Sequence, residues 1–143
     1  MLQNQLCFPL YASSRLTTKL YAPYLKELGL TYPQYLVMLV LWEQDAQGVN
    51  RIAQRLHLET NTITPLLQRL EQKGLILKKR SPADERSTEV HLSESGRMLQ
   101  KQAETIPIKI LGAFQNADLS FEEVKSLQQT LFKLLHTLKE KVN

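Results

Sequence analysis

The spacing of apolar residues along the chain predicts a mainly helical protein with one small β-hairpin. Residues 36–42 are apolar on nearly every side, which indicates a fully buried helix. Residues 63–70 place their apolar side chains with the i, i+3, i+4, i+7 spacing of an amphipathic helix. Residues 75–78 and 89–92 alternate with period two, so they are expected to form two strands joined by a charged, turn-rich loop at 80–86.

Capping residues predict where the helices begin and end. Pro9 fits the first turn of a helix, so the first helix is expected to begin at Cys7 or Phe8 and to run toward Leu28, where Gly29 ends it. Gly74 is expected to end the helix that contains residues 63–70. The other predicted caps are Thr31 with Gln34, Asn50 after a turn at 47–48, Thr60 with Asn61, Ser93, and Ser120 with Glu123.

The last third of the chain predicts helices that need a partner. Pro107 is expected to kink or divide the helix that begins after Ser93. The final helix carries a coiled-coil-like stripe made of Val124, Leu127, Leu131, Leu134 and Leu138. Because the chain is small and has long helices at both ends, we expect a homodimer that forms through these N- and C-terminal helices.

Two helices joined by a tight turn and followed by a hairpin form the winged helix-turn-helix arrangement. Its second helix enters the major groove of DNA, so the outer face of that helix must be slim and able to form hydrogen bonds. The candidate DNA-binding residues on this outer face are Asn61, Thr62, Thr64, Pro65, Gln68 and Arg69. Asn61 and Thr62 also lie at the helix start, where main-chain amides favour phosphate.

Most of the excess positive charge lies in one short segment. The chain has a formal charge of +4, and residues 69–86 hold six basic against three acidic side chains. Such an island suits phosphate, although a solvated charged surface explains it equally well. Lys79 and Arg80 are candidate DNA contacts. In the loop, the Asp84 carboxylate can hold the Arg86 guanidinium outward for a narrow minor groove, although this motif taken alone favours an ordinary surface ion pair.

Cys7 is the only cysteine, so no internal disulfide is possible and a reducing cytoplasm is the expected compartment. A lone cysteine is most often a small buried apolar residue. Two features favour reactivity instead. A helix N-terminus favours the thiolate, and all five tyrosines lie within the first 35 residues, where phenol hydroxyls are good donors to such an anion. Packing at a dimer interface is the alternative role for these tyrosines.

Several motifs resemble, in order, the MarR family of dimeric winged-helix transcription regulators. The matching runs are 61–76, 84–86 and 90–96. The resemblance implies a mostly α-helical fold with a small β-hairpin wing, and a homodimer on double-stranded DNA with a pseudo-palindromic operator. It implies a single domain over 1–143, with dimerisation helices at 1–30 and 93–143 and a DNA-binding lobe at 31–92. Asp84 and Arg86 are the implied wing pair.

Residues 6–11 and 30–35 are similar to the organic hydroperoxide-sensing branch of that family, the OhrR repressors. The resemblance assigns Cys7 as the reactive thiol, Tyr21 and Tyr32 as its hydrogen-bond partners, one of them from the opposite subunit, and Tyr11 as a further pocket tyrosine. The implied mechanism begins when an organic hydroperoxide oxidises Cys7 to a sulfenic acid. Without a second cysteine, a small cellular thiol must form a mixed disulfide or the sulfur over-oxidises. The enlarged group then shifts the dimer, and DNA is released.

Three other interpretations stay open. A regulator of the same family could respond to a small aromatic or anionic ligand, with Cys7 not functional. A thiol peroxidase could react with the same peroxides, although no histidine, arginine or second cysteine lies near Cys7 in sequence to organise a catalytic cycle. A plain oligomerisation module would not use the basic hairpin. The three histidines are scattered and the longest apolar run is short, so we expect no metal, no cofactor, no catalytic residue and no membrane span.

Overall fold

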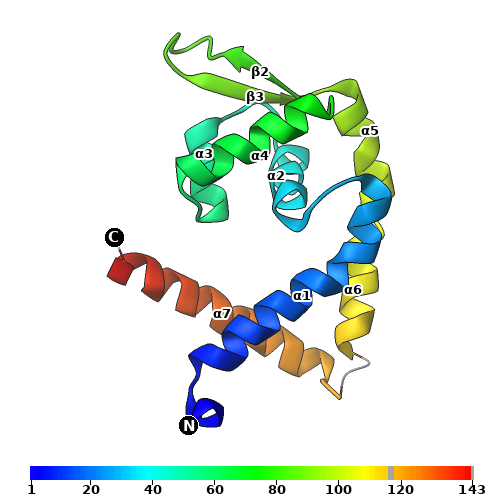
Figure 1. Ribbon diagram of the computed structural model, residues 1–143, viewed down its shortest axis with the longest axis vertical. Helices are drawn as coiled ribbons and strands as arrows, with labels where there is room; N and C mark the ends of the chain where they lie inside the picture. The colour runs from blue at the N-terminus through cyan, green and yellow to red at the C-terminus, as the bar shows by residue number, and fades with distance from the viewer. Residues whose placement is uncertain (116–117, 143) are drawn as a thin grey trace. The chain divides into compact units, whose positions relative to one another are not determined.

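The computed structural model describes residues 1–115 and 118–142, and most of them are helical (Figure 1). The chain divides into two compact units, Met1–Glu104 and Thr105–Asn143. The first unit contains a short 3-10 helix (Leu2–Asn4), α1 (Cys7–Leu28), α2 (Tyr32–Glu43), β1 (Gln47–Gly48), α3 (Val49–Leu56), α4 (Thr60–Gln72), β2 (Ile76–Arg80), β3 (Thr88–Leu92) and α5 (Glu94–Ala103). The second unit contains α6 (Ile106–Gln115) and α7 (Phe121–Val142).

Most of the predicted helix ends are confirmed. At the start of α2, the main-chain N–H of Gln34 donates to Thr31 Oγ1 at 3.4 Å, and the N–H of Thr31 donates to Gln34 Oε1 at 3.2 Å, which is the expected capping box. Helix α1 begins at Cys7, as predicted. The break between α5 and α6 confirms that the helix divides just before Pro107. The ends at Gly29 and Gly74 and the caps at Ser93 and at Ser120 with Glu123 are also confirmed.

Two predicted caps are wrong. Helix α3 begins directly after Gly48, so Asn50 lies inside its first turn, where its Oδ1 accepts a hydrogen bond from Thr60 Oγ1 at 3.4 Å. Helix α4 begins after Glu59, so Thr60 and Asn61 are helical residues and not caps. The reason for the first error is that the backbone up to Gly48 pairs with a strand, and the helix can start only after that pairing ends.

A three-stranded antiparallel sheet replaces the expected two-stranded hairpin. Its order is β1-β3-β2, with Gln47 opposite Val90 and Ile76 opposite Leu92. The predicted turn at 47–48 is therefore an edge strand. Ile76 and Val90 are fully buried whereas Leu77 is exposed, so one face of the sheet packs on the helices and the other faces outward. In Figure 1 the β2–β3 hairpin extends past α3 and α4.

Helix α2 forms the centre of the first unit. Val37, Met38 and Leu41 are fully buried. The expectation that α2 is buried on every side is wrong, because one side of this helix, including Leu39 and Trp42, is only half-buried. Around it pack the buried residues of α3 and α4, which are Ile52, Ala53, Ile63, Leu67 and Leu70.

Asp45 ties the end of α2 to the sheet and to α5. Its Oδ1 accepts hydrogen bonds from the N–H groups of Leu92 at 2.7 Å and Ala46 at 2.8 Å, and its Oδ2 accepts one from Arg97 at 2.8 Å. Burial by itself raises the pKa of Asp45, but the hydrogen bonds and the Arg97 charge outweigh it and lower the pKa below the ordinary 3.8.

Protonation of the Asp45 carboxylate should make the free energy of unfolding depend on pH. A lowered pKa means that charged Asp45 favours the folded state, so its contribution is complete above the ordinary pKa of 3.8 and is lost as pH falls through the lower folded value. We expect the free energy of urea unfolding to differ between wild type and Asp45→Asn by a constant amount above about pH 5, and by less below about pH 4. A difference that persists unchanged to about pH 2 would contradict this account.

Candidate nucleic-acid interface and thiol site

The outer face of α4 carries the predicted DNA-binding residues. Ile63, Leu67 and Leu70 are buried, which fixes the rotation of the helix about its axis. Thr64 Oγ1 donates to the carbonyl of Thr60 at 2.9 Å, so its side chain is held while its oxygen can still accept a hydrogen bond. The structure places all six predicted α4 residues on the exposed side: Asn61, Thr62, Thr64, Pro65, Gln68 and Arg69.

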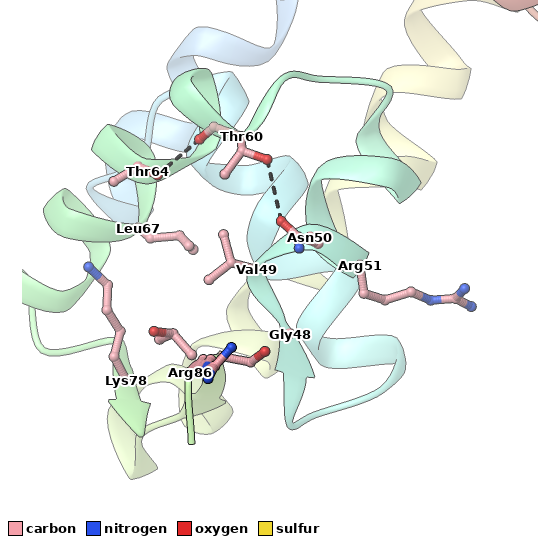
Figure 2. A pocket seen from close by; sticks show the side chains of 11 residues that line it. Gly48, Val49, Asn50, Arg51, Thr60, Thr64, Leu67, Lys78 and Arg86 are labelled. Atoms are coloured by element: carbon pink, nitrogen blue, oxygen red, sulfur yellow. Dashed lines mark hydrogen bonds between the residues drawn. The ribbon is translucent and has the colours of Figure 1, made fainter. Parts of the chain in front are cut away.

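A groove of about 550 Å³ lies between α4 and the hairpin (Figure 2). Helix α4 contributes Thr60, Thr64 and Leu67, and the hairpin side contributes Lys78 and Arg86. The start of α3 completes the wall. The cationic side chains of Lys78 and Arg86 therefore line one hollow together with several hydroxyl groups, among them those of Thr60 and Thr64, which is the chemistry that suits phosphate oxygens.

Sequence reasoning missed Lys78 as a candidate contact, although it belongs to the basic segment. Its register on β2 puts it two residues after buried Ile76 and opposite buried Val90, so it points to the helix side of the sheet. Lys78 Nζ lies 3.9 Å from Glu71 Oε1 of α4. The two-residue period of the strand could have predicted that Lys78 lies on the helix side of the sheet. Arg51, which extends outward from α3 in Figure 2, was also missed.

Asp84 holds the hairpin loop differently from the prediction. Its Oδ1 accepts a hydrogen bond from the main-chain N–H of Arg86 at 3.0 Å, and its Oδ2 accepts one from Ser87 Oγ at 3.1 Å. In the part of the chain that the structure describes, no ion pair joins Asp84 to the Arg86 guanidinium, so that expectation is wrong. The reason is that an aspartate reaches the main-chain N–H two residues on more easily than a side chain. Lys79 and Arg80 are exposed.

Cys7 is exposed in the single chain, at the first residue of α1. Tyr11 follows one turn later, is also exposed, and its ring centroid lies 5.8 Å from the Arg15 guanidinium carbon. The neighbouring exposed apolar side chains are Leu6, Phe8 and Leu10. The thiol therefore stands in an apolar surface that a second molecule could cover.

Tyr21 and Tyr32 lie in contact, with Tyr35 as a third ring. Ring centroids of Tyr21 and Tyr32 are 4.9 Å apart, and Tyr35 lies 5.9 Å from Tyr21 and 6.4 Å from Tyr32. Burial and the neighbouring phenols raise the pKa of Tyr21 to about 12, and burial also raises the pKa of Tyr32 and Tyr35. These phenols therefore keep their protons at neutral pH and can donate hydrogen bonds to an anion.

One chain does not bring Cys7 to these tyrosines. Cys7 and Tyr21 lie on the same helix, and their separation along it corresponds to about 21 Å at 1.5 Å per residue. Because Tyr21 and Tyr32 are in contact with each other, they belong to the same subunit. A thiol bonded by both phenols of one chain would therefore belong to a second copy, whereas the sequence resemblance implies that one of the two tyrosines comes from the opposite subunit.

Among residues 1–115 and 118–142, no three His, Cys, Asp or Glu side chains form a group that could hold a metal ion. Within the same residues, no helix is long and apolar enough to span a bilayer.

The helix pair, the adjacent hairpin and the polar outer face of α4 define a winged helix-turn-helix protein. A family model described as transcriptional regulator SarA/Rot matches residues 19–103. The organic hydroperoxide resistance transcriptional regulator of Bacillus subtilis (strain 168) is 49% identical over 140 residues, which cover 98% of this chain and 93% of that protein. The chain therefore belongs to the SarA/Rot and MarR-type family of winged-helix transcription regulators, and the resemblance seen in its sequence is confirmed.

Solved structures of AbfR, a Staphylococcus epidermidis protein, are similar to this chain over almost its full length. Reduced AbfR bound to DNA matches with a TM-score of 0.81 and 36% identity, covering 99% of this chain and 95% of that one. Overoxidized AbfR bound to DNA matches with a TM-score of 0.76 and 38% identity, covering 96% and 94%. The Bacillus relative is named as a regulator and not as an enzyme.

Proposed function

We propose that this chain is a repressor that holds operator DNA while Cys7 is reduced and releases it when an organic hydroperoxide oxidises Cys7. Two observations support the proposal: the thiol of Cys7 is exposed at the start of α1, and Tyr21 and Tyr32 form a cluster whose phenols keep their protons and which a second copy would have to bring to the thiol. The name of the Bacillus relative connects such a regulator with organic hydroperoxides. Because a transcription regulator acts on chromosomal DNA, we place it in the cytoplasm.

A homodimer would complete the thiol site and explain the open apolar helix faces. None of the residues of α7 is buried, and its leucine stripe includes the exposed Leu127, Leu131 and Leu138. The N-terminal part of α1 is equally exposed and apolar. Burying both faces against a second copy supports a dimer through the N- and C-terminal helices, and a two-fold dimer reads a pseudo-palindromic operator with its two α4 helices.

The oxidation step is a displacement on the peroxide. The Cys7 thiolate attacks the outer oxygen of the O–O bond, an S–O bond forms, and the alkoxide leaves and takes up a proton to become an alcohol. Sulfur loses two electrons, and the peroxide gains them. A small cellular thiol then attacks the sulfenic acid and expels water, which leaves a mixed disulfide on Cys7.

The mixed disulfide is the form that we expect to release DNA. AbfR has been solved on DNA in both the reduced and the overoxidized state, so added oxygen atoms alone do not exclude DNA in that protein. A whole thiol molecule on Cys7 is far bulkier than a sulfinate. It would displace the phenols of Tyr21 and Tyr32 and move the two subunits, so that their α4 helices no longer match half-sites one helical turn apart.

The proposal is tested by a gel shift on a duplex from the region upstream of the protein's own gene. Cumene hydroperoxide is added with and without a small thiol, and the intact mass of the protein is measured in parallel. We expect release together with a mass increase equal to the bound thiol. Complete conversion of Cys7 to the mixed disulfide with DNA still bound would refute the redox mechanism.

Arg86→Gln should weaken binding to all DNA sequences alike. Arg86 lines the groove beside α4, where it can meet phosphate but not a particular base. We expect the slope of log K against log salt concentration to fall by about 1 for each phosphate group that the variant no longer neutralises. Lys26→Gln is the matched control, since it removes the same charge from the last turn of α1. An equally weakened affinity in both variants, measured by fluorescence anisotropy, would contradict a role for the groove.

The groove also supports a second candidate function, regulation by a small aromatic or anionic ligand. Its lining includes Lys78, Arg86 and the hydroxyl groups of Thr60 and Thr64, and this set can hold a carboxylate. The test measures DNA release by salicylate and by cumene hydroperoxide in wild type and in Cys7→Ser, which lacks the thiol. Release of DNA by salicylate but not by cumene hydroperoxide in the wild type would favour the ligand. Release by peroxide that requires Cys7 would favour the redox function.

A further inference from the structure

The aromatic contacts of the tyrosine cluster continue along α2 to Trp42. Tyr35 is 2% exposed and packs against Tyr21 and Tyr32 on one side. Its ring centroid lies 6.3 Å from that of Trp42, at an edge-on angle of 67°. Residues 35 and 42 are two turns apart on the same helix, so the rings form a row along it. If Tyr21 or Tyr32 moves, it must push on the closely packed ring of Tyr35, and that ring is in contact with Trp42.

Trp42 forms a hydrogen bond at the junction of α4, which is the proposed DNA-recognition helix, with the β2–β3 hairpin and α5. Its indole Nε1 donates a hydrogen bond to the carbonyl of Gly96 at 2.9 Å. Gly96 lies in the first turn of α5 and is packed so closely on Leu75 that a Cβ atom there would lie 2.1 Å from the Leu75 carbonyl oxygen. Leu75 joins α4 to β2, and its carbonyl also accepts a hydrogen bond from the N–H of Ser93 at 3.0 Å.

We infer that Trp42 is the positioning residue that carries the oxidation state of Cys7 from the tyrosines to the recognition helix and the wing. The inference rests on the proposed function, because it takes the tyrosines as the partners of the thiol. In the reduced state the indole N–H holds Gly96 and, through it, the end of α4 and the start of β2. When the tyrosines are displaced, the aromatic row shifts, the hydrogen bond to Gly96 breaks, and both DNA-binding elements lose a common anchor.

The indole N–H is the part of Trp42 that this role requires. Phenylalanine keeps an aromatic ring against Tyr35 but has no donor for the Gly96 carbonyl. Trp42→Phe is therefore expected to bind operator DNA more weakly than wild type in the reduced state, and to lose less affinity on oxidation because the bond that oxidation breaks is already absent. The quantity to measure is the ratio of operator affinities before and after oxidation. We expect this ratio to fall about three- to tenfold relative to wild type, the range of one hydrogen bond.

Glu43→Gln is the matched control. Glu43 is the neighbour of Trp42 on α2 and pairs with Arg55 of α3 at 2.5 Å, so it also links the end of α2 to another helix but has no contact with the aromatic row. We expect Glu43→Gln to keep the wild-type affinity ratio. An equal fall of the ratio in both variants would overturn the inference, because it would show only a general need for a firmly packed α2.

Trp42 is the only tryptophan, so its emission gives a second measurement on the unmodified ring. In the full-length protein we expect cumene hydroperoxide with a small thiol to shift the emission in wild type and leave it unchanged in Cys7→Ser. Release of DNA with unchanged emission, or an unaltered affinity ratio in Trp42→Phe, would overturn the inference and leave the proposed function intact. A wild type that keeps its DNA although Cys7 carries the mixed disulfide would instead refute the proposed function itself.

Discussion

Replacing Cys7 by serine is expected to give a protein that binds the upstream duplex as tightly as wild type and no longer releases it when cumene hydroperoxide and a thiol are added. Serine has nearly the same size, and the side chain is exposed in the single chain, so reduced-state binding should be kept. A hydroxyl group does not attack the O–O bond under these conditions. We expect the operator affinity of wild type to fall about 100-fold on oxidation and that of Cys7→Ser to stay almost unchanged.

Methionine oxidation is the competing chemical explanation, and Met98→Leu controls for it. Met98 lies on α5 and is 65% exposed, so its thioether is open to peroxide. Met98→Leu should keep the full wild-type response. A response that disappears in Met98→Leu and survives in Cys7→Ser would move the sensor away from the first turn of α1.

Gly96→Ala is expected to cause a large loss of stability in the first unit. The added methyl group would lie 2.1 Å from the Leu75 carbonyl oxygen and 3.2 Å from its carbon, and these are main-chain atoms that cannot turn aside. Either α5 or the α4–β2 junction must move. We expect the free energy of urea unfolding to fall by about 3 kcal/mol or more.

Gly112→Ala on α6 is the matched control for Gly96→Ala. Apart from its chain neighbours and the backbone of its own helix, no atom of the described residues lies within 4 Å of the position where its Cβ would stand. Alanine is the better helix former, so this variant should gain stability, by up to about 1 kcal/mol. If both substitutions had the same effect, the close approach of Gly96 to Leu75 would have no energetic weight.

Sequence patterns predicted those features that arise within a few residues. The capping box of Thr31 and Gln34 satisfies main-chain groups three residues apart, so its outcome does not depend on the rest of the fold. The same holds for the exposed side of α4, because the buried positions of Ile63 and Leu67 set the orientation of every other residue on the helix. The predicted DNA-binding face is therefore present as a surface.

Most features that sequence did not predict depend on pairing between distant segments, and the others depend on local backbone geometry. Residues 47–48 carry a turn-like Gln-Gly pair, yet they are extended because Val90 and Glu89 supply their strand partners. The Asp84 carboxylate could accept a hydrogen bond from either the main-chain N–H or the guanidinium of Arg86, and the loop geometry selects the main-chain N–H. The contact of Tyr21 with Tyr32 requires α1 to fold back on α2, which no local pattern records.

Because α1 separates Cys7 from Tyr21 of the same chain, the response of the proposed peroxide sensor in a cell depends on dimer formation. Under the proposed function, a newly made subunit cannot place its own tyrosines on its own thiol, so it would respond to peroxide through this site only after it meets a second copy. Sensitivity is then set by how much of the protein the cell makes as well as by the chemistry of sulfur. A chain whose terminal helices fail to assemble would lose detection and its hold on DNA together.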